Sequence, residues 1–163
     1  MTNERPDPDD LLKVVKDETH RSQRGQLKIF FGACAGVGKT FAILQAARHL
    51  HAEGVAVGIG IVETHGRKDT QELLEGLPVL PRKTMSGNGR PTSEFDLDGA
   101  LASGYQILVV DELAHTNVAG SRHTKRWQDV EELLDAGIDV FTALNVQHLD
   151  SLNDIVGGII GIR

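Results

Sequence analysis

The feature that most constrains the fold of this 163-residue sequence is a glycine-containing segment between an apolar run and a stretch of helical periodicity. The apolar run covers 27–31 and is typical of a buried strand. Apolar residues then recur at helical spacing from Thr40 to His51, and Gly54 marks the end of that helix. A tight glycine loop between a strand and a helix directs backbone N–H groups and the positive end of the helix toward an anion. The order of strand, loop and helix therefore predicts a phosphate-binding loop.

The loop also carries side chains that suit a nucleoside triphosphate. Lys39 can reach the β- and γ-phosphates, and the hydroxyl of Thr40 can ligate Mg²⁺. The sequence has the form A-x-x-G-x-G-K-T, since Ala33 stands where the strict pattern has glycine. A glycine-rich turn that binds nothing is the competing interpretation, and the flanking strand and helix favour phosphate binding. We expect the phosphates of ATP to be bound by Ala33, Cys34, Ala35, Gly36, Val37, Gly38, Lys39 and Thr40.

Acidic side chains stand at the ends of two further apolar runs that we predict as strands. Asp111 and Glu112 directly follow one run, and Glu63 ends the other. Asp111 is the expected partner of Thr40 in holding Mg²⁺. Glu112 could polarise a water or accept a proton from an attacking hydroxyl, and Glu63 could contact a substrate. Acids also occur at strand ends without a role. The predicted catalytic side chains are Lys39, Glu63 and Glu112.

Two other groups of polar side chains are candidates for contacts with the γ-phosphate. Asn145 follows the fourth predicted strand, where a polar side chain can sense that phosphate. The basic cluster 121–126, which contains Arg122 and Arg126, could supply a charge-stabilising arginine within the chain or from the neighbouring subunit of a homodimer. A solvated turn before a helix is the alternative interpretation of this cluster.

Strand-like and helical segments alternate along the sequence. This alternation implies right-handed crossovers and a mostly parallel sheet covered on both faces. We therefore expect an α/β fold of P-loop NTPase-like (RecA/ASCE) type, which is a three-layer sandwich. The predicted strands cover 27–31, 55–62, 107–110 and 138–144, and the predicted helices cover 40–51, 69–75, 96–103, 125–136 and 149–156. The segment 76–91, with three prolines and three glycines, is expected to be irregular and exposed.

The sequence is expected to have two parts. Residues 1–25 are predicted to form an arm with a short helix, and residues 26–163 are predicted to form the nucleotide-binding domain. Four strands are fewer than a parallel sheet of this kind usually has. We therefore expect that domain to be truncated at its C-terminal end.

Composition excludes some classes of function. The formal net charge of −6 argues against binding to nucleic acid. No apolar run approaches the roughly 20 residues that span a bilayer, so we expect this segment not to contact a membrane. The single cysteine, Cys34, cannot form an internal disulfide, which fits a reducing cytoplasm.

The loop and several motifs outside it resemble those of one family. They comprise Arg5–Asp9, Leu27–Thr40, Val62–Arg67, Asp111–Asn117, Gly120–His123, Lys125–Asp129 and Asn145–Leu149. Together they resemble the N-terminal domain of the KdpD family, the osmosensitive potassium-channel sensor histidine kinases. The resemblance runs from about Arg5 to Arg163.

The resemblance implies a cytoplasmic domain of a bacterial inner-membrane protein, the sensor of a two-component system that controls high-affinity potassium uptake. In such proteins a stress-protein-like domain, transmembrane helices and a histidine kinase core follow, and the kinase acts with a cognate response regulator. The phosphorylated histidine of the family lies in that core. No histidine of this sequence is therefore expected to have that role.

These observations lead to three hypotheses of different classes. The first is an ATP-binding regulatory domain whose nucleotide occupancy tunes the kinase and phosphatase output of the parent sensor. The second is an active phosphotransferase that uses the same loop, either as a slow ATPase or as a serine/threonine kinase. The third is a docking module with a vestigial loop.

Overall fold

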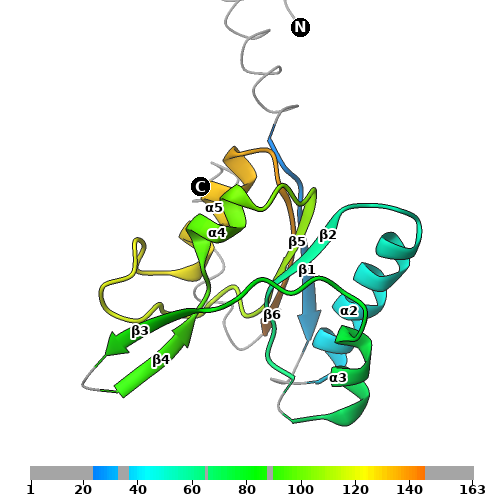
Figure 1. Ribbon diagram of the computed structural model, residues 1–163, viewed down its shortest axis with the longest axis horizontal. Helices are drawn as coiled ribbons and strands as arrows, with labels where there is room; N and C mark the ends of the chain where they lie inside the picture. Colours follow the sequence, from blue (N-terminus) through cyan, green and yellow to red (C-terminus); the bar gives the residue numbers. More distant parts are fainter. Residues whose placement is uncertain (1–23, 33–36, 65, 88–89, 146–163) are drawn as a thin grey trace, which may run out of the picture.

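Within the part of the chain that the structure describes, the main sheet has four parallel strands. The computed structural model describes residues 24–32, 37–64, 66–87 and 90–145. The strands stand in the order β1 (Leu27–Gly32), β6 (Asp139–Asn145), β5 (Ile107–Val110) and β2 (Val57–Ile61). All neighbouring pairs are parallel, so their carboxyl ends lie at one edge of the sheet (Figure 1). This arrangement confirms the predicted α/β class with a mostly parallel sheet.

Helices cover both faces of this sheet and make three layers. On one face lie α2 (Val37–Ala52) and α3 (Lys68–Leu74), and on the other lie α4 (Leu97–Ala102) and α5 (Arg126–Asp135) (Figure 1). Successive residues of a strand point to opposite faces. Val109 of β5 accordingly joins the apolar cluster with α2, whereas Leu108 joins the cluster with α5. Aliphatic side chains buried on both faces hold the layers together.

A close approach between backbone and ring explains one glycine of β2. A Cβ on Gly60 would lie 2.8 Å from Cε1 of Phe95 and 3.1 Å from the Val109 carbonyl oxygen. The missing side chain lets Phe95, which is 5% exposed, pack directly on the sheet. Phe95 thereby anchors the end of the segment that connects α3 to α4.

That connecting segment corrects one prediction. The segment 76–91 was expected to be irregular, but most of it is ordered by backbone pairing. Strands β3 (Lys83–Gly87) and β4 (Arg90–Glu94) form an antiparallel two-stranded sheet, which stands apart from the main sheet (Figure 1). Pro78 does not prevent pairing before the hairpin, because a proline retains its carbonyl. That carbonyl accepts a hydrogen bond of 2.8 Å from the Ile59 N–H.

Two sequence predictions concern segments outside the described residues. The arm at 1–25 is described only at its last two residues, and the helix predicted at 149–156 is not described. Among the helices that the structure describes, none is long and apolar enough to cross a membrane.

Candidate functional site

Two side chains that are 71 positions apart in the sequence meet at the carboxyl edge of the sheet. The Thr40 hydroxyl donates a hydrogen bond of 3.3 Å to Oδ2 of Asp111. Thr40 lies in the first turn of α2, and Asp111 is the residue directly after β5. Both side chains are buried. The pair that the sequence predicted as the metal-binding oxygens is thus assembled by the fold.

Backbone hydrogen bonds fix Asp111 in this position. Its N–H donates to the carbonyl of Ile61, which extends the pairing of β5 with β2. Its carboxylate accepts from the N–H of Glu112 at 2.9 Å and from the N–H of Glu63 at 3.4 Å. The residues that follow β2 and β5 are therefore joined through one carboxylate.

Burial controls the charge of this carboxylate. Removal from water raises the pKa of the Asp111 carboxyl above its usual value of 3.8, although hydrogen bonds from Glu112, Glu63 and Thr40 oppose that shift. A divalent cation beside the carboxylate would favour its ionised form. A hydroxyl and a carboxylate are also the hard oxygen donors that suit Mg²⁺. The residues present therefore fit a magnesium ion.

The chain leaves the sheet in opposite directions on either side of this pair. After β1 it passes to α2 on one face, and after β5 it passes to α5 on the other face. In open α/β sheets, such a reversal creates a crevice at the carboxyl edge in which ligands bind. The Cα atoms of Gly32 and Asn145 are register partners, so β1 and β6 end side by side at this edge.

The structure describes the predicted phosphate-binding residues only in part. Gly38, Lys39 and Thr40 lie in the first turn of α2, which begins at Val37, three residues before the predicted start of the helix. Residues 33–36 lie outside the described ranges, and so do the side chains of Val37 and Asn145. Their predicted roles stay predictions.

Glu112 has an unusual backbone conformation. Its φ of 54° lies in the left-handed region, which is uncommon for a residue with a side chain. The chain turns back there, and the next N–H, that of Leu113, donates to the carbonyl of Ala143 on β6. The Glu112 side chain is exposed at the sheet edge. Outliers of this kind cluster at functional sites.

Glu63, the third predicted acid, is engaged by an arginine that the sequence analysis did not select. Arg82 donates from Nη1 to Glu63 Oε1 at 3.1 Å and from Nη2 to the Val62 carbonyl at 2.7 Å. Arg82 comes directly before β3. No local sequence pattern links two residues that are 19 positions apart, so only the fold shows this pair.

The two arginines of the basic cluster have different surroundings. Arg126 is 2% exposed and donates to Glu94 Oε1 and to the Asp111 carbonyl, both at 2.9 Å. Arg122 is half-exposed and pairs with Asp98 and Glu132. The cluster is therefore not simply a solvated turn. Arg126 fixes the backbone of Asp111 through the hydrogen bond to its carbonyl, and Arg122 links α4 to α5 through its two ion pairs.

Glu94 is the centre of a buried network that sequence reasoning missed. Its Oε2 lies 3.1 Å from Nε2 of His115 and 3.0 Å from the N–H of Val118. Burial opposes ionisation of Glu94, but these hydrogen bonds and the charges of His115 and Arg126 hold its pKa below the usual 4.5. The ionised Glu94 therefore ties the loop after Asp111 to the end of the hairpin.

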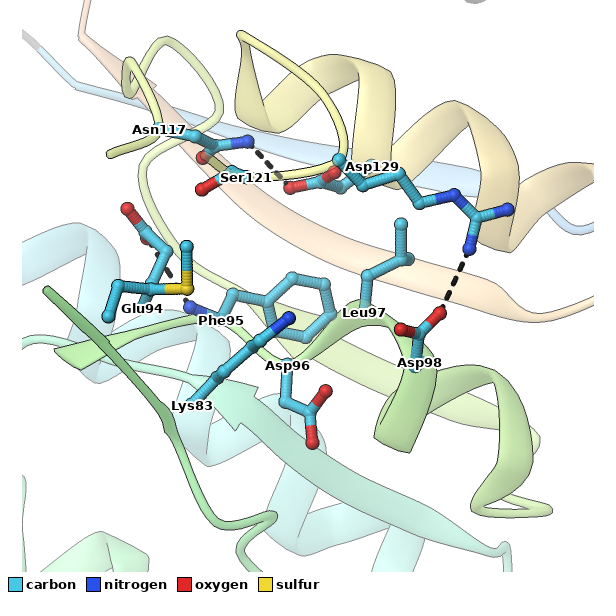
Figure 2. Close-up of a pocket in the computed structure, with 11 residues that line it drawn as sticks. Lys83, Glu94, Phe95, Asp96, Leu97, Asp98, Asn117, Ser121 and Asp129 are labelled. Atoms are coloured by element: carbon cyan, nitrogen blue, oxygen red, sulfur yellow. Dashed lines mark hydrogen bonds and ion pairs between the residues drawn. The ribbon is translucent and has the colours of Figure 1, made fainter. Parts of the chain in front are cut away.

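A small pocket lies beside this network and away from the Thr40–Asp111 pair. Lys83, Glu94, Phe95, Asp96, Asn117 and Asp129 are among the residues that line it (Figure 2). The Asn117 amide donates to Asp129 at 2.9 Å, which links the loop to α5. Burial raises the pKa of the Asp129 carboxyl, and the hydrogen bond from Asn117 opposes that shift. Of the site candidates predicted from the sequence, Ser121 and Arg122 of the basic cluster line this pocket, whereas Thr40, Glu63, Asp111 and Glu112 do not.

The fold and the site together define an α/β protein whose parallel sheet carries a hydroxyl–carboxylate pair at its carboxyl edge. The family described as "KdpD: Osmosensitive K+ channel His kinase sensor domain" matches residues 23–163. The chain belongs to this family, and the predicted resemblance is confirmed.

Curated relatives agree with this assignment. The sensor protein KdpD of Escherichia coli K12 is 61% identical over 165 residues, which cover 100% of this chain and 18% of the relative. The sensor protein KdpD of Clostridium acetobutylicum is 54% identical, covering 96% of this chain and 17% of the relative. A putative sensor protein KdpD of Synechocystis is 49% identical, and the match covers 93% of this chain and 40% of the relative. The chain thus spans less than a fifth of the first two relatives, whose remaining length implies further domains in such proteins.

Proposed function

We propose that this chain binds ATP with Mg²⁺ at the carboxyl edge of its sheet and that nucleotide occupancy regulates a longer sensor kinase. The observation that carries the proposal is the 3.3 Å hydrogen bond between Thr40 and Asp111. It brings the hydroxyl at the start of a helix against a carboxylate at the end of a parallel strand. This is the pair of oxygens that phosphate-loop proteins use for Mg²⁺.

The topology supports a P-loop NTPase-like fold of the RecA/ASCE type. The segment between β1 and α2 carries the A-x-x-G-x-G-K-T sequence, and the first turn of α2 contains Lys39 and Thr40. Strand β6 stands between β1 and β5, so the loop and Asp111 come from strands that are not neighbours.

The donor set favours a metal bound together with phosphate rather than alone. In the described ranges, no three His, Cys, Asp or Glu side chains gather as a metal cage. Mg²⁺ is usually held by one or two carboxylates, several waters and the substrate phosphates. When bound, it would neutralise charge on the phosphate oxygens. Thr40 and Asp111 would hold it, and Lys39 would contact the β- and γ-phosphates.

Membership of the family supports the regulatory role. The curated relatives are sensor proteins that are several times longer than this chain. We infer that the domain lies on the cytoplasmic side of a bacterial inner membrane, beside the stress-protein-like and kinase parts of its parent. Its nucleotide state would bias the parent between kinase and phosphatase output toward the cognate response regulator. Such coupling requires that ATP bind the two states with different affinity.

Lys39→Ala in the full-length sensor tests this role. We expect the variant to lose ATP binding at this domain and to change the ratio of kinase to phosphatase activity, because Lys39 contacts the phosphates. Phosphorylation and dephosphorylation of the response regulator by membranes containing the sensor would be measured. Lys28→Ala is the matched control, since Lys28 is exposed on β1. Loss of ATP binding with unchanged output would refute the regulatory role.

One observation favours a second function, an active phosphotransferase. The exposed Glu112 directly follows Asp111 and has a left-handed backbone, and its carboxylate could act as a base at the crevice. With water as acceptor the domain would be a slow ATPase, and with a protein hydroxyl it would be a serine/threonine kinase. Incubation of the chain with γ-labelled ATP and Mg²⁺ separates these functions, because it yields free phosphate, labelled protein or neither. Glu112→Gln should abolish either product.

A further inference from the structure

Arg82 holds the two residues that follow β2. Its guanidinium donates to the Val62 carbonyl at 2.7 Å and to the Glu63 carboxylate at 3.1 Å. A planar guanidinium presents several donors in a fixed geometry that matches carboxylate and phosphate groups. Arg82 therefore has the chemistry of a phosphate contact, and its present partner is a carboxylate.

The same two residues adjoin the proposed metal site. The Glu63 N–H lies 3.4 Å from Oδ2 of Asp111, the oxygen that also accepts from Thr40. The Arg82 guanidinium and the Asp111 carboxylate thus bond to the same peptide group, the guanidinium to its carbonyl and the carboxylate to its N–H, on opposite sides of that group. A terminal phosphate that shares Mg²⁺ with Thr40 and Asp111 would come within reach of the flexible Arg82 side chain.

The ion pair between Arg82 and Glu63 is suited to exchange. The two side chains are 38% and 43% exposed, and ion pairs at such positions are weak because water screens them. A terminal phosphate carries more charge than a carboxylate and can accept two parallel hydrogen bonds from guanidinium. A bound nucleotide can therefore compete for Arg82.

The other arginines are less well placed for this contact. Arg126 is buried between Glu94 and the Asp111 carbonyl, and Arg122 is paired with Asp98 and Glu132. Of the arginine side chains in the described ranges, only Arg82 bonds to the residues that follow β2. Arg67 is exposed at the start of α3 and is the nearest rival in sequence.

We propose that Arg82 releases Glu63 and contacts the terminal phosphate of bound ATP, and that this exchange lets the site distinguish ATP from ADP. The proposal rests on the function proposed above. It assigns to Arg82 the phosphate contact for which the sequence suggested the cluster 121–126. Glu63 becomes the residue that holds Arg82 when the terminal phosphate is absent.

Nucleotide titrations of the purified chain test the proposal. Dissociation constants for ATP and ADP would be measured in Mg²⁺ for the wild type and for Arg82→Ala, Arg82→Lys, Arg67→Ala and Arg48→Ala. Arg48 is the control, because its guanidinium bonds the carbonyls of Leu73 and Glu75, away from the Thr40–Asp111 pair. We expect Arg82→Ala to weaken ATP binding by about ten-fold or more and to leave ADP binding within about two-fold. Arg82→Lys should give an intermediate loss, and Arg48→Ala no change.

The outcomes separate this proposal from the function on which it rests. If the wild type binds ATP but Arg82→Ala keeps the same ratio of ATP to ADP affinity, Arg82 does not read the terminal phosphate. An equal loss for both nucleotides would show a structural role only and would also overturn the proposal. A selective loss of ATP affinity in Arg67→Ala, with none in Arg82→Ala, would assign the phosphate contact to Arg67 and overturn the proposal. If the wild type binds neither nucleotide, the proposed function itself fails.

Discussion

At the scale of single residues, Asp111 combines a position suited to Mg²⁺ with an environment that disfavours its charge. The carboxylate is buried, and burial raises its pKa despite three hydrogen bonds. A raised pKa in the folded state means that the ionised group destabilises the fold at neutral pH relative to a neutral isostere. Functional sites often carry such a cost in stability.

We therefore predict that Asp111→Asn stabilises the ligand-free chain while it weakens Mg²⁺ binding. The melting temperature at neutral pH should rise by about 2–4 °C, which is the shift that roughly 1 kcal/mol makes in a domain of this size. The gain in melting temperature should shrink as the pH falls through the raised pKa of Asp111 and on toward 3.8, because the wild-type carboxyl then becomes neutral as well. Thermal melts followed by circular dichroism would measure both effects. Asp98→Asn, at an exposed carboxylate, is the control, and a lower melting temperature for Asp111→Asn at neutral pH would contradict the account.

Glu94 shows the opposite electrostatic behaviour. Its pKa in the folded state is lowered below 4.5, so its contribution to stability is present above that pH and is lost as the pH falls through the lowered value. We predict that Glu94→Gln lowers the free energy of unfolding at neutral pH by about 3 kcal/mol, since Arg126 then keeps a buried charge without a counter-charge. The deficit relative to the wild type should shrink in acid.

Urea unfolding at several pH values would test the prediction for Glu94. The quantity to follow is the difference in free energy of unfolding between wild type and variant. Asp111 and Asp129 have raised pKa values, so they give the stability of both proteins an opposite dependence on pH, which cancels in that difference. Glu132→Gln is a suitable control, since Glu132 pairs with Arg122 at a partly exposed position. A deficit that is constant across the pH range would exclude an electrostatic role for Glu94.

At the scale of elements, the sequence predicted what local patterns encode. The apolar runs gave the strands, and the residues directly after them included the acid that the fold brings to Thr40. Parallel strands place their carboxyl ends at one edge of the sheet. The predicted ends of β1 and β5 therefore placed Thr40, at the start of the following helix, and Asp111 in the same region. Helix boundaries followed from glycines such as Gly54 and Gly137, which adopt positive φ after α2 and α5.

The hairpin was missed although the sequence holds a signal for it, and its contacts could not be predicted from local patterns. Prolines and glycines in 76–91 indicated a loop, whereas the Asn88-Gly89 pair between two polar strands is a known hairpin signal. Arg82 and Glu94, at the two ends of the hairpin, contact Glu63 and Arg126 at separations of 19 and 32 positions. Such buried or bridging polar pairs depend on tertiary packing. They tie both ends of the hairpin to the residues after β2 and β5.

At the scale of the whole molecule, the chain corresponds to a small part of its curated relatives. It belongs to the KdpD sensor family and matches 17–18% of the length of two curated relatives. In the proposed role, the domain would signal nucleotide binding to the rest of a sensor only if ATP binds two of its conformations with different affinity. Arg82 and the hairpin offer the element that would respond, because Arg82 directly precedes β3 and pairs with Glu63, whose N–H donates to Asp111.

The most direct measurement is the Mg²⁺-dependent thermal stabilisation of the chain by ATP, compared among the wild type, Thr40→Ala and Thr40→Ser. At an ATP concentration of about a hundred times Kd, binding would add roughly 2.7 kcal/mol to the free energy of unfolding of the wild type. We predict this stabilisation with ATP and Mg²⁺, its retention in Thr40→Ser, which keeps the hydroxyl, and loss of its Mg²⁺-dependent part in Thr40→Ala. Absence of any ATP-dependent shift in the wild type, or equal Mg²⁺ dependence in Thr40→Ala, would contradict the proposed site.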